Sequence, residues 1–371
     1  MKMITFLKYF LACVAALCAL IALGGWAFYK WHPVFGGQPD EISLTKMRAS
    51  KAFNGETFDN LEPTPLMTSN EPPSIWRSAM RFLNPVEGKN PIQPLPTVPL
   101  NTAQLKNGSV VWFGHSTVLF QTDGKLFITD PVFHAASPLP MGGKPFAMTH
   151  AHTVAELPPI DGVLISHDHY DHLDYQAIQE IDAKTAHFYV PLGVKAHLQR
   201  WGVAEHKITE MDWNEQARLG NVAITLVPSR HFSGRTFDRN TTLWGGYVVK
   251  SPDVSLYFSA DSGYGKHFAD IIAKHAPFDL AMMENGAYNT KWALIHSTPE
   301  QAAQAMHDIG AQKVLPIHWG KFDLSEHAWK DPIERFTRAA EEKSLEVATP
   351  KIGEVFQIEN LPKEKWWESV Q

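Results

Sequence analysis

The sequence predicts an α/β fold in which strands alternate with helices around one large core. From Gly108 onward, short apolar runs typical of buried strands alternate with helical patterns such as residues 193–202 and 299–310. A stretch of about 260 residues is long enough to bury a single large core in an α/β sandwich. An apolar N-terminal segment and a proline-rich stretch precede it. We therefore expect three regions, residues 1–30, 31–105 and 106–360.

The first region is expected to be a single membrane-spanning helix. Residues 9–29 carry no charge and are rich in Leu, Ala, Ile, Phe and Val. As a helix this run would be about 31 Å long, enough to cross a hydrocarbon core of about 30 Å. A signal peptide is the alternative, because Lys2 and Lys8 precede the run, but no small-x-small cleavage site ends it. We favour an uncleaved anchor in a bacterial-type inner membrane, with the catalytic domain in the periplasm.

The second region, residues 31–105, is expected to wrap the domain as extended and turn segments. Nine prolines fall between Pro63 and Pro99. Proline fixes φ and has no N–H to donate, so this stretch is a poor candidate for regular helices or central strands. We expect an extension of the domain, without a core of its own.

The most informative segment is the run His167-Asp168-His169-Tyr170-Asp171-His172. Imidazole and carboxylate groups are the usual ligands of Zn²⁺ and related divalent ions. The run follows a buried strand pattern at 160–166 and precedes a helical pattern at 173–181 that Asp174 can cap. The alternative is a histidine-rich surface loop, but such loops seldom lie between an apolar strand and a capped helix. The pattern predicts a metal site on rigid supports.

Three later strand patterns end on residues that could complete a site for two metal ions. These are residues 222–231 with His231, 255–263 with Asp261, and 313–320 with His318. Each alone would more often be an ordinary buried histidine or turn aspartate. As an ordered set behind the first cluster, they favour a dinuclear site. The remaining histidines, His150 and His152 among them, show no ligand pattern and are expected at the surface or in packing.

Several motifs make the chain resemble the metallo-β-lactamase superfamily, and within it the N-acylphosphatidylethanolamine phospholipase D group. The resemblance runs from about residue 110 to residue 322 and includes Trp112-Phe113-Gly114-His115-Ser116-Thr117, Ala260-Asp261-Ser262-Gly263-Tyr264 and Ile317-His318-Trp319-Gly320. It implies an αββα sandwich of the metallo-β-lactamase type behind the N-terminal transmembrane helix. β-Lactam hydrolases of the superfamily commonly use a cysteine in the second metal site. Both cysteines here, Cys13 and Cys18, lie in the N-terminal apolar run, which argues against a β-lactamase.

The resemblance also implies how the ligands are shared between the ions. One ion would be held by His167, His169 and His231, the other by Asp171, His172 and His318, with Asp261 bridging the two. Zn²⁺ is the expected metal, and Mn²⁺ or Fe²⁺ would suit the same ligands. Asp171 would also orient the nucleophile, which makes it a catalytic residue.

Further residues are expected to act on the substrate. His296 lies beside a strong helix start formed by Thr298 and Pro299. It resembles a non-ligand active-site histidine that contacts the scissile phosphate or donates a proton to the leaving group; the alternative is a polar residue near a helix cap. Contacts to substrate are expected from Tyr288, Lys291, Trp292 and Arg235, with core packing as the alternative for Trp292 and an ion pair for Arg235. His115 and Asp130 lie in family motifs but match no ligand position, and we expect them to be structural.

These features and the resemblance together predict a membrane-anchored dinuclear metallohydrolase. Its expected substrate is the phosphodiester of a phospholipid of the N-acylphosphatidylethanolamine type. One alternative is a lactonase or sugar-phosphate hydrolase, because the same site attacks carbonyls. The other is a non-catalytic membrane-associated scaffold that retains a structural metal site. The formal net charge of −6 and the lack of a basic stripe argue against nucleic acid as a partner. The phospholipase-like relatives are commonly dimers, which makes a homodimer a candidate assembly, although the sequence itself does not indicate the oligomeric state.

Overall fold

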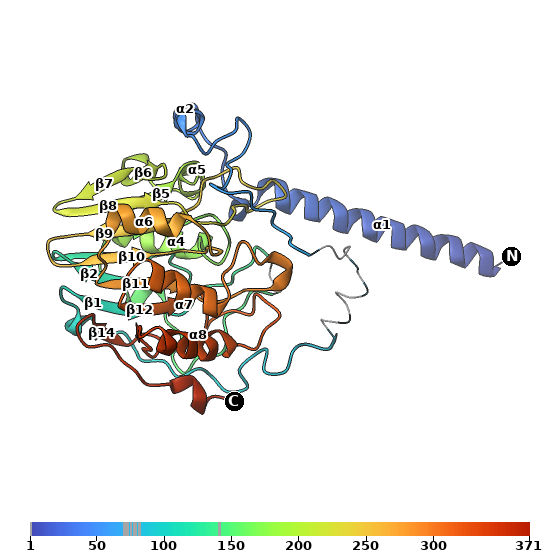
Figure 1. Cartoon of the computed structure of the whole chain (residues 1–371). Helices are drawn as coiled ribbons and strands as arrows, with labels where there is room; N and C mark the ends of the chain where they lie inside the picture. Colours follow the sequence, from blue (N-terminus) through green and yellow to red (C-terminus); the bar gives the residue numbers. More distant parts are fainter. Residues whose placement is uncertain (1, 70–73, 75, 77–79, 81–82, 140–141) are drawn as a thin grey trace.

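Two seven-stranded sheets form the centre of the molecule in this computed structural model, which describes residues 2–69, 74, 76, 80, 83–139 and 142–371 (Figure 1). The first sheet has the order β14-β1-β2-β3-β4-β5-β6 and the second the order β13-β12-β11-β10-β9-β8-β7. The first contains β1 (Ser109–Trp112), β2 (Val118–Thr122), β3 (Lys125–Thr129), β4 (Ile160–Leu164), β5 (Thr185–Pro191), β6 (Ile208–Met211) and β14 (Val355–Gln357). The second contains β7 (Gln216–Leu219), β8 (Val222–Val227), β9 (Gly246–Lys250), β10 (Ser255–Phe258), β11 (Leu280–Glu284), β12 (Lys313–Ile317) and β13 (Glu346–Val347).

Helices cover the outer face of each sheet, which gives the predicted αββα order of layers (Figure 1). The first sheet is covered by α4 (Tyr175–Ile181) and α5 (Lys195–Arg200), and the second by α6 (His267–His275), α7 (Pro299–Asp308) and α8 (Asp331–Glu342). The helix starts follow the sequence signals. Asp174 Oδ1 accepts the N–H groups of Gln176 and Ala177, and α7 opens with a capping box between Thr298 and Gln301.

The central strands are apolar along nearly their whole length because both of their faces are covered. Every residue of β11 is buried, as are four of the five residues of β12. The largest apolar core lies between the two sheets, and smaller cores lie under the helices. The core between the sheets also includes Met47, Phe58 and Leu95 from the proline-rich region, and Trp366 and Trp367 from beyond residue 360. Residues on both sides of 106–360 therefore contribute to the same core.

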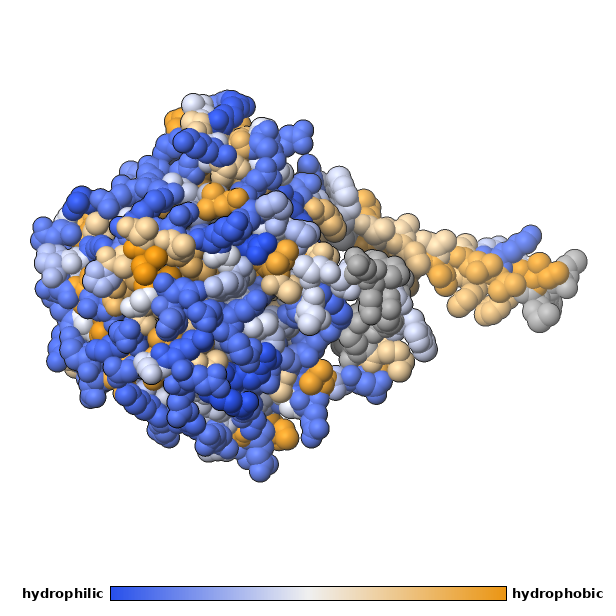
Figure 2. Space-filling view, viewed as in Figure 1, coloured by the Kyte–Doolittle hydropathy of each residue, from blue (hydrophilic) through white to orange (hydrophobic). Residues whose placement is uncertain are grey.

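The N-terminal helix α1 (Lys2–Trp31) projects from this sandwich as one continuous exposed helix (Figure 1). Figure 2 shows it as a mostly apolar rod beside a mostly polar body. Its span Ile4–Trp31 is long and apolar enough to cross a membrane, and none of its most apolar window is buried. The chain then enters the domain, where Trp201 Nε1 donates to Pro33 O at 2.6 Å. A second short helix, α2 (Glu41–Ala49), follows in the proline-rich region.

Candidate metal centre

Four strand ends bring the expected metal ligands together at one edge of the sandwich. His167 follows β4, His231 follows β8, Asp261 follows β10 and His318 follows β12. The remaining three, His169, Asp171 and His172, lie in the turn that joins β4 to α4. Rigid strands thus fix the positions of side chains that are about 150 residues apart in sequence.

The first group of ligands consists of His167, His169 and His231. His167 Nε2 lies 2.9 Å from His169 Nδ1, and His231 Nε2 lies 3.3 Å from the same atom. Tetrahedral ligands on Zn²⁺, with bonds of about 2.0–2.1 Å, are separated by about 3.3 Å. The three nitrogen atoms therefore converge at the spacing of a metal site.

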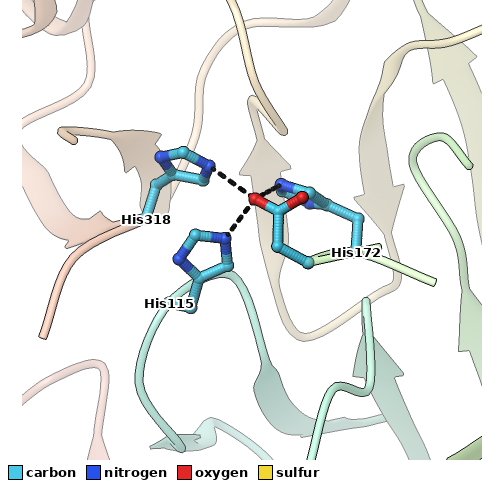
Figure 3. A group of neighbouring side chains, drawn as sticks. His115, His172 and His318 are labelled. Carbon is cyan, nitrogen blue, oxygen red and sulfur yellow. Dashed lines mark hydrogen bonds and ion pairs between the residues drawn. The ribbon is translucent and has the colours of Figure 1, made fainter. Parts of the chain in front are cut away.

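The second group is centred on the carboxylate of Asp171. Figure 3 shows His115, His172 and His318 pointing toward one carboxylate oxygen. His172 Nε2 and His318 Nε2 lie 3.4 and 3.5 Å from Asp171 Oδ2. His115 Nε2 is closer, at 3.0 Å. We expected His115 to be structural; its ring contacts Asp171 directly and helps to orient this carboxylate.

Asp261 lies between the two groups. Its Oδ2 atom is 3.0 Å from His318 Nε2 and 3.1 Å from His172 Nε2. The same oxygen is 3.7 Å from His231 Nε2 and 3.9 Å from His167 Nε2. This is the position expected of a ligand shared by two ions.

The Nδ1 atoms of three histidines lie within hydrogen-bond distance of neighbouring groups. Their Nε2 atoms therefore face the ligand cluster. His172 Nδ1 lies 2.8 Å from Asp130 Oδ2, and His167 Nδ1 lies 2.8 Å from Ser166 Oγ. Ser166 also donates its N–H and its hydroxyl to Asp130. His231 Nδ1 is 2.9 Å from a main-chain carbonyl oxygen. Such partners fix the ring orientation and tautomer of metal-binding histidines, which is the role the structure gives to Asp130.

Buried polar atoms without partners support a fit to divalent cations. His172 Nε2, His318 Nε2 and Asp261 Oδ1 are buried and have no hydrogen-bond partner among the described residues. Two carboxylates that face buried imidazoles are costly unless cations compensate their charge. The donor set, imidazole nitrogen and carboxylate oxygen, is the one that Zn²⁺, Mn²⁺ and Fe²⁺ accept.

The pKa values of the clustered histidines also support the binding of divalent cations. Burial lowers the pKa of His169 and of His231 to about 3, so these rings stay in the neutral form that binds metals. Burial also opposes protonation of His318, but the charge of Asp261 and the close carboxylate of Asp171 raise its pKa to about 10. The carboxylates thus attract positive charge strongly, and a metal ion would supply it.

The position of His318 depends on its own main-chain conformation and on the close approach of the main chain at Gly286. This residue has a φ of +66°, a left-handed conformation that turns its side chain at the end of β12. A Cβ on Gly286 would lie 1.9 Å from the carbonyl oxygen of His318, so no larger residue fits at this position.

His296 lies beside the ligands and has a buried carboxyl partner. Its Nδ1 atom lies 2.5 Å from Glu284 Oε1, and Glu284 is the last residue of β11. Burial and the nearby charge of Asp261 raise the pKa of Glu284 well above its usual value. Burial lowers the pKa of His296 to about 4. A protonated Glu284 donating to Nδ1 leaves the Nε2–H of His296 free to act on the substrate.

A cavity of about 290 Å³ opens onto the ligands. It is lined by His169, Asp171, Asp261, His296 and His318, together with Leu66, Met67, Phe232, Arg239, Ala287, Trp292, Ile295 and Leu324. Of the four residues expected to contact substrate, Trp292 lies in this lining. Tyr288 donates its hydroxyl to Asp331, and Lys291 Nζ is paired with Glu326 at 2.7 Å. No sequence pattern indicated Arg239, whose guanidinium lies 5.0 Å from the centre of the Phe232 ring.

Residues 126–319 match the family model for the beta-lactamase superfamily domain. The chain belongs to the metallo-β-lactamase superfamily. It is 37% identical over 369 residues to an uncharacterized protein of Mycobacterium tuberculosis, covering 95% of this chain and 98% of that one. It is 30% identical to the N-acyl-phosphatidylethanolamine-hydrolyzing phospholipase D 1 of Caenorhabditis elegans, covering 66% of this chain and 74% of the relative.

A solved structure shows the same fold. The metallo hydrolase Igni18 from Ignicoccus hospitalis superposes with a TM-score of 0.53 at 21% identity, covering 67% of this chain and 97% of that one. A protein of Pyrobaculum neutrophilum described as a metal-dependent hydrolase is 25% identical over 248 residues. Our protein is thus a metal-dependent hydrolase of the metallo-β-lactamase superfamily.

Arg235, which we expected to contact the substrate, does not line the cavity that opens onto the ligands. Its guanidinium is buried and donates to the carbonyl oxygens of Asp168 at 2.8 Å, Leu173 at 2.7 Å and Val34 at 3.0 Å. It also lies 4.2 Å from the centre of the Tyr170 ring. Arg235 therefore ties the metal-binding turn to the segment that follows α1.

We expect Arg235→Ala to lower the free energy of unfolding by about 2–4 kcal/mol, because it leaves three carbonyl oxygens without their donor. Arg235→Lys should restore less than half of the loss, since one ammonium cannot reproduce the planar fork. Denaturant unfolding of the metal-loaded protein measures both. A loss below about 0.5 kcal/mol for the alanine variant would contradict the role we assign.

Proposed function

We propose that this hydrolase cleaves the phosphodiester of a membrane phospholipid of the N-acylphosphatidylethanolamine type, using two divalent ions with Zn²⁺ as the expected metal. The observation that carries the proposal is the cavity that reaches the ligand cluster. Its apolar walls, from Leu66, Met67, Phe232, Trp292, Ile295 and Leu324, suit an acyl chain. The 30% identity to a phospholipase D of this specificity supports the same substrate class.

The protein residues have separable tasks in the reaction. Two divalent ions held by the seven ligands would activate water at neutral pH and draw charge from the phosphoryl oxygens. Asp171 is partly exposed, with 17% of its side chain accessible against 2% for Asp261, and can orient the attacking water. His296 can donate its Nε2–H to the ethanolamine oxygen as the P–O bond breaks. The products would be phosphatidic acid and an N-acylethanolamine.

The candidate membrane helix ends beside a loop that contributes to the cavity lining. The Tyr29 ring of α1 lies 5.4 Å from the Phe237 ring, and Phe237 is 89% exposed. Phe237 belongs to the same loop that contributes Phe232 and Arg239 to the cavity lining. If α1 spans a bilayer, this loop lies at the bilayer surface, so a lipid could reach the cavity without crossing water.

The full chain in detergent, loaded with Zn²⁺, should release N-acylethanolamine from vesicles that contain N-acylphosphatidylethanolamine. In water enriched in ¹⁸O, the label should enter phosphatidic acid, because attack at phosphorus breaks the P–O bond to ethanolamine. Mass spectrometry of both products measures the reaction. A parallel assay with a lactone and a sugar phosphate tests the alternative substrates.

A metal-loaded protein that leaves the lipid intact but opens the lactone would overturn the phospholipase assignment. Trp292→Ala serves as a probe of the cavity. It should raise KM for the long-chain lipid several-fold through lost apolar contact, with a smaller effect on a water-soluble phosphodiester such as bis(p-nitrophenyl) phosphate. Equal effects on both substrates would contradict binding of the acyl chain at this wall.

A further inference from the structure

Three side chains outside the catalytic cluster form a second candidate metal site. They are His150 and His152, on the connection between β3 and β4, and Glu156, in the 3-10 turn Val154–Glu156. His150 Nε2 lies 3.0 Å and His152 Nδ1 lies 3.1 Å from the same oxygen, Glu156 Oε2. We propose that these residues bind one Zn²⁺ ion at a peripheral site that is separate from the catalytic pair.

The distances from Glu156 Oε2 to the two imidazole nitrogens agree with a tetrahedral ion, and the three ligand atoms lie within 4.8 Å of one another. Ligand atoms on tetrahedral Zn²⁺ lie about 3.3 Å apart, so 3.0 and 3.1 Å require only a small outward movement. The nitrogens of the catalytic cluster in the same structure show comparable separations of 2.9 and 3.3 Å. The two rings, with centroids 4.9 Å apart and planes at 79°, converge on one point without stacking.

Each ligand is held in place by other contacts. Glu156 Oε1 accepts the N–H and hydroxyl of Thr153, which leaves Oε2 for the two imidazoles. The N–H of His150 donates to Thr97 Oγ1 at 2.7 Å. The His152 ring packs edge-on against Phe113 at 5.0 Å. Such preorganisation lowers the cost of binding an ion.

The close packing of His152 depends on a glycine. A Cβ on Gly353 would lie 2.3 Å from His152 Nε2, so the ring fits only because residue 353 has no side chain. With Nε2 facing Gly353 and Nδ1 facing Glu156, the ring can bind an ion through Nδ1. His152 is buried, whereas 37% of the His150 side chain is exposed.

The exposure of His150 determines how easily water reaches the site and how readily a bound ion exchanges. Three protein ligands leave a fourth position for water, and solvent can reach it past His150. We therefore expect an ion that exchanges readily and leaves before the two buried ions when a chelator is added. When bound, it would fasten the connection that leads into β4, the strand that ends at the metal-binding turn.

The test counts zinc ions on the full chain in detergent. After removal of metals and equilibrium dialysis against micromolar free Zn²⁺, elemental analysis should give about three ions per chain for the unaltered protein. His150→Gln and Glu156→Gln should each bind one ion fewer. His307→Gln is the matched control, because it replaces an exposed histidine on α7 and should not change the count.

Two results would overturn the proposal. One is a zinc count of two ions or fewer that is the same in the unaltered protein, His150→Gln and Glu156→Gln. The other is a third ion that persists in both variants, which would mean an adventitious ion only. Because His150 is half-exposed and its main chain is held by Thr97, His150→Gln tests the ligand without disturbing the fold. Its far-ultraviolet circular dichroism should match that of the unaltered protein.

Discussion

Asp261→Asn is expected to reduce hydrolysis by roughly 10³-fold or more and to lower the zinc bound by the seven-ligand cluster from about two ions to one or fewer. Asp261 Oδ2 is within 3.9 Å of four imidazole nitrogens, so a single carboxylate serves both groups of ligands. An amide keeps the shape but removes the negative charge. A loss of about 4 kcal/mol in transition-state stabilisation corresponds to this change in rate. Elemental analysis and kcat/KM measure the two effects.

The matched control for this substitution is Asp270→Asn, which removes an exposed carboxylate on α6, a helix that covers the outer face of the second sheet. It should retain both ions and full activity. A chelator should have the same effect on the unaltered enzyme as Asp261→Asn, and added Zn²⁺ should restore only the unaltered enzyme. An Asp261→Asn protein that keeps both ions and normal turnover would show that Asp261 is not the bridging ligand.

His296→Gln is expected to lower kcat by about 10²–10³-fold while both metal ions remain bound. Its Nδ1 atom is bound to Glu284, so its Nε2–H is the donor available at the cavity. General acid catalysis by a positioned histidine contributes 10²–10⁴-fold in typical enzymes. The loss should shrink for a substrate with a good leaving group, such as p-nitrophenolate, which needs no proton. Loss of metal together with activity would mean that His296 is a ligand.

The partner of His296 can be tested by two substitutions at one position. Because burial raises the pKa of Glu284, we expect it to be protonated and to donate to His296. Glu284→Gln retains a donor for His296 Nδ1 and an acceptor for the N–H of Ser262, and should reduce kcat by less than about tenfold. Glu284→Met removes both and should cost roughly 10–100-fold. A larger loss in Glu284→Gln than in Glu284→Met would contradict this arrangement.

The fold and the convergence of the seven candidate ligands could be predicted from the sequence, because local strand patterns and the family resemblance both indicate them. His231, Asp261 and His318 each end an apolar strand, and adjacent strand ends meet at one edge of the sandwich. The rule that polar residues at strand ends face this edge would also have indicated Glu284, a carboxylate that ends the buried strand Leu280–Glu284.

Other features depend on contacts that a single sequence does not display. Arg235 was expected at the substrate because guanidinium groups bind phosphates, yet its acceptors are main-chain carbonyls, which have no sequence signature. His115 lies in a left-handed turn, φ +55°, that brings it to Asp171 from 56 positions away. His150 and His152 lack a strand-end context, and only the turn at Glu156 brings them together.

The bond from Arg235 to Val34 has a practical consequence for anyone who wishes to prepare a water-soluble version of this enzyme. A start site chosen just after the apolar helix, near His32, keeps Val34 as the acceptor and Gly37 as the donor to His197. A start site at the end of the proline-rich stretch would discard both, along with Met47, Phe58 and Leu95 from the interior. Such a shortened product should precipitate or lose zinc during purification, even though every ligand is still encoded.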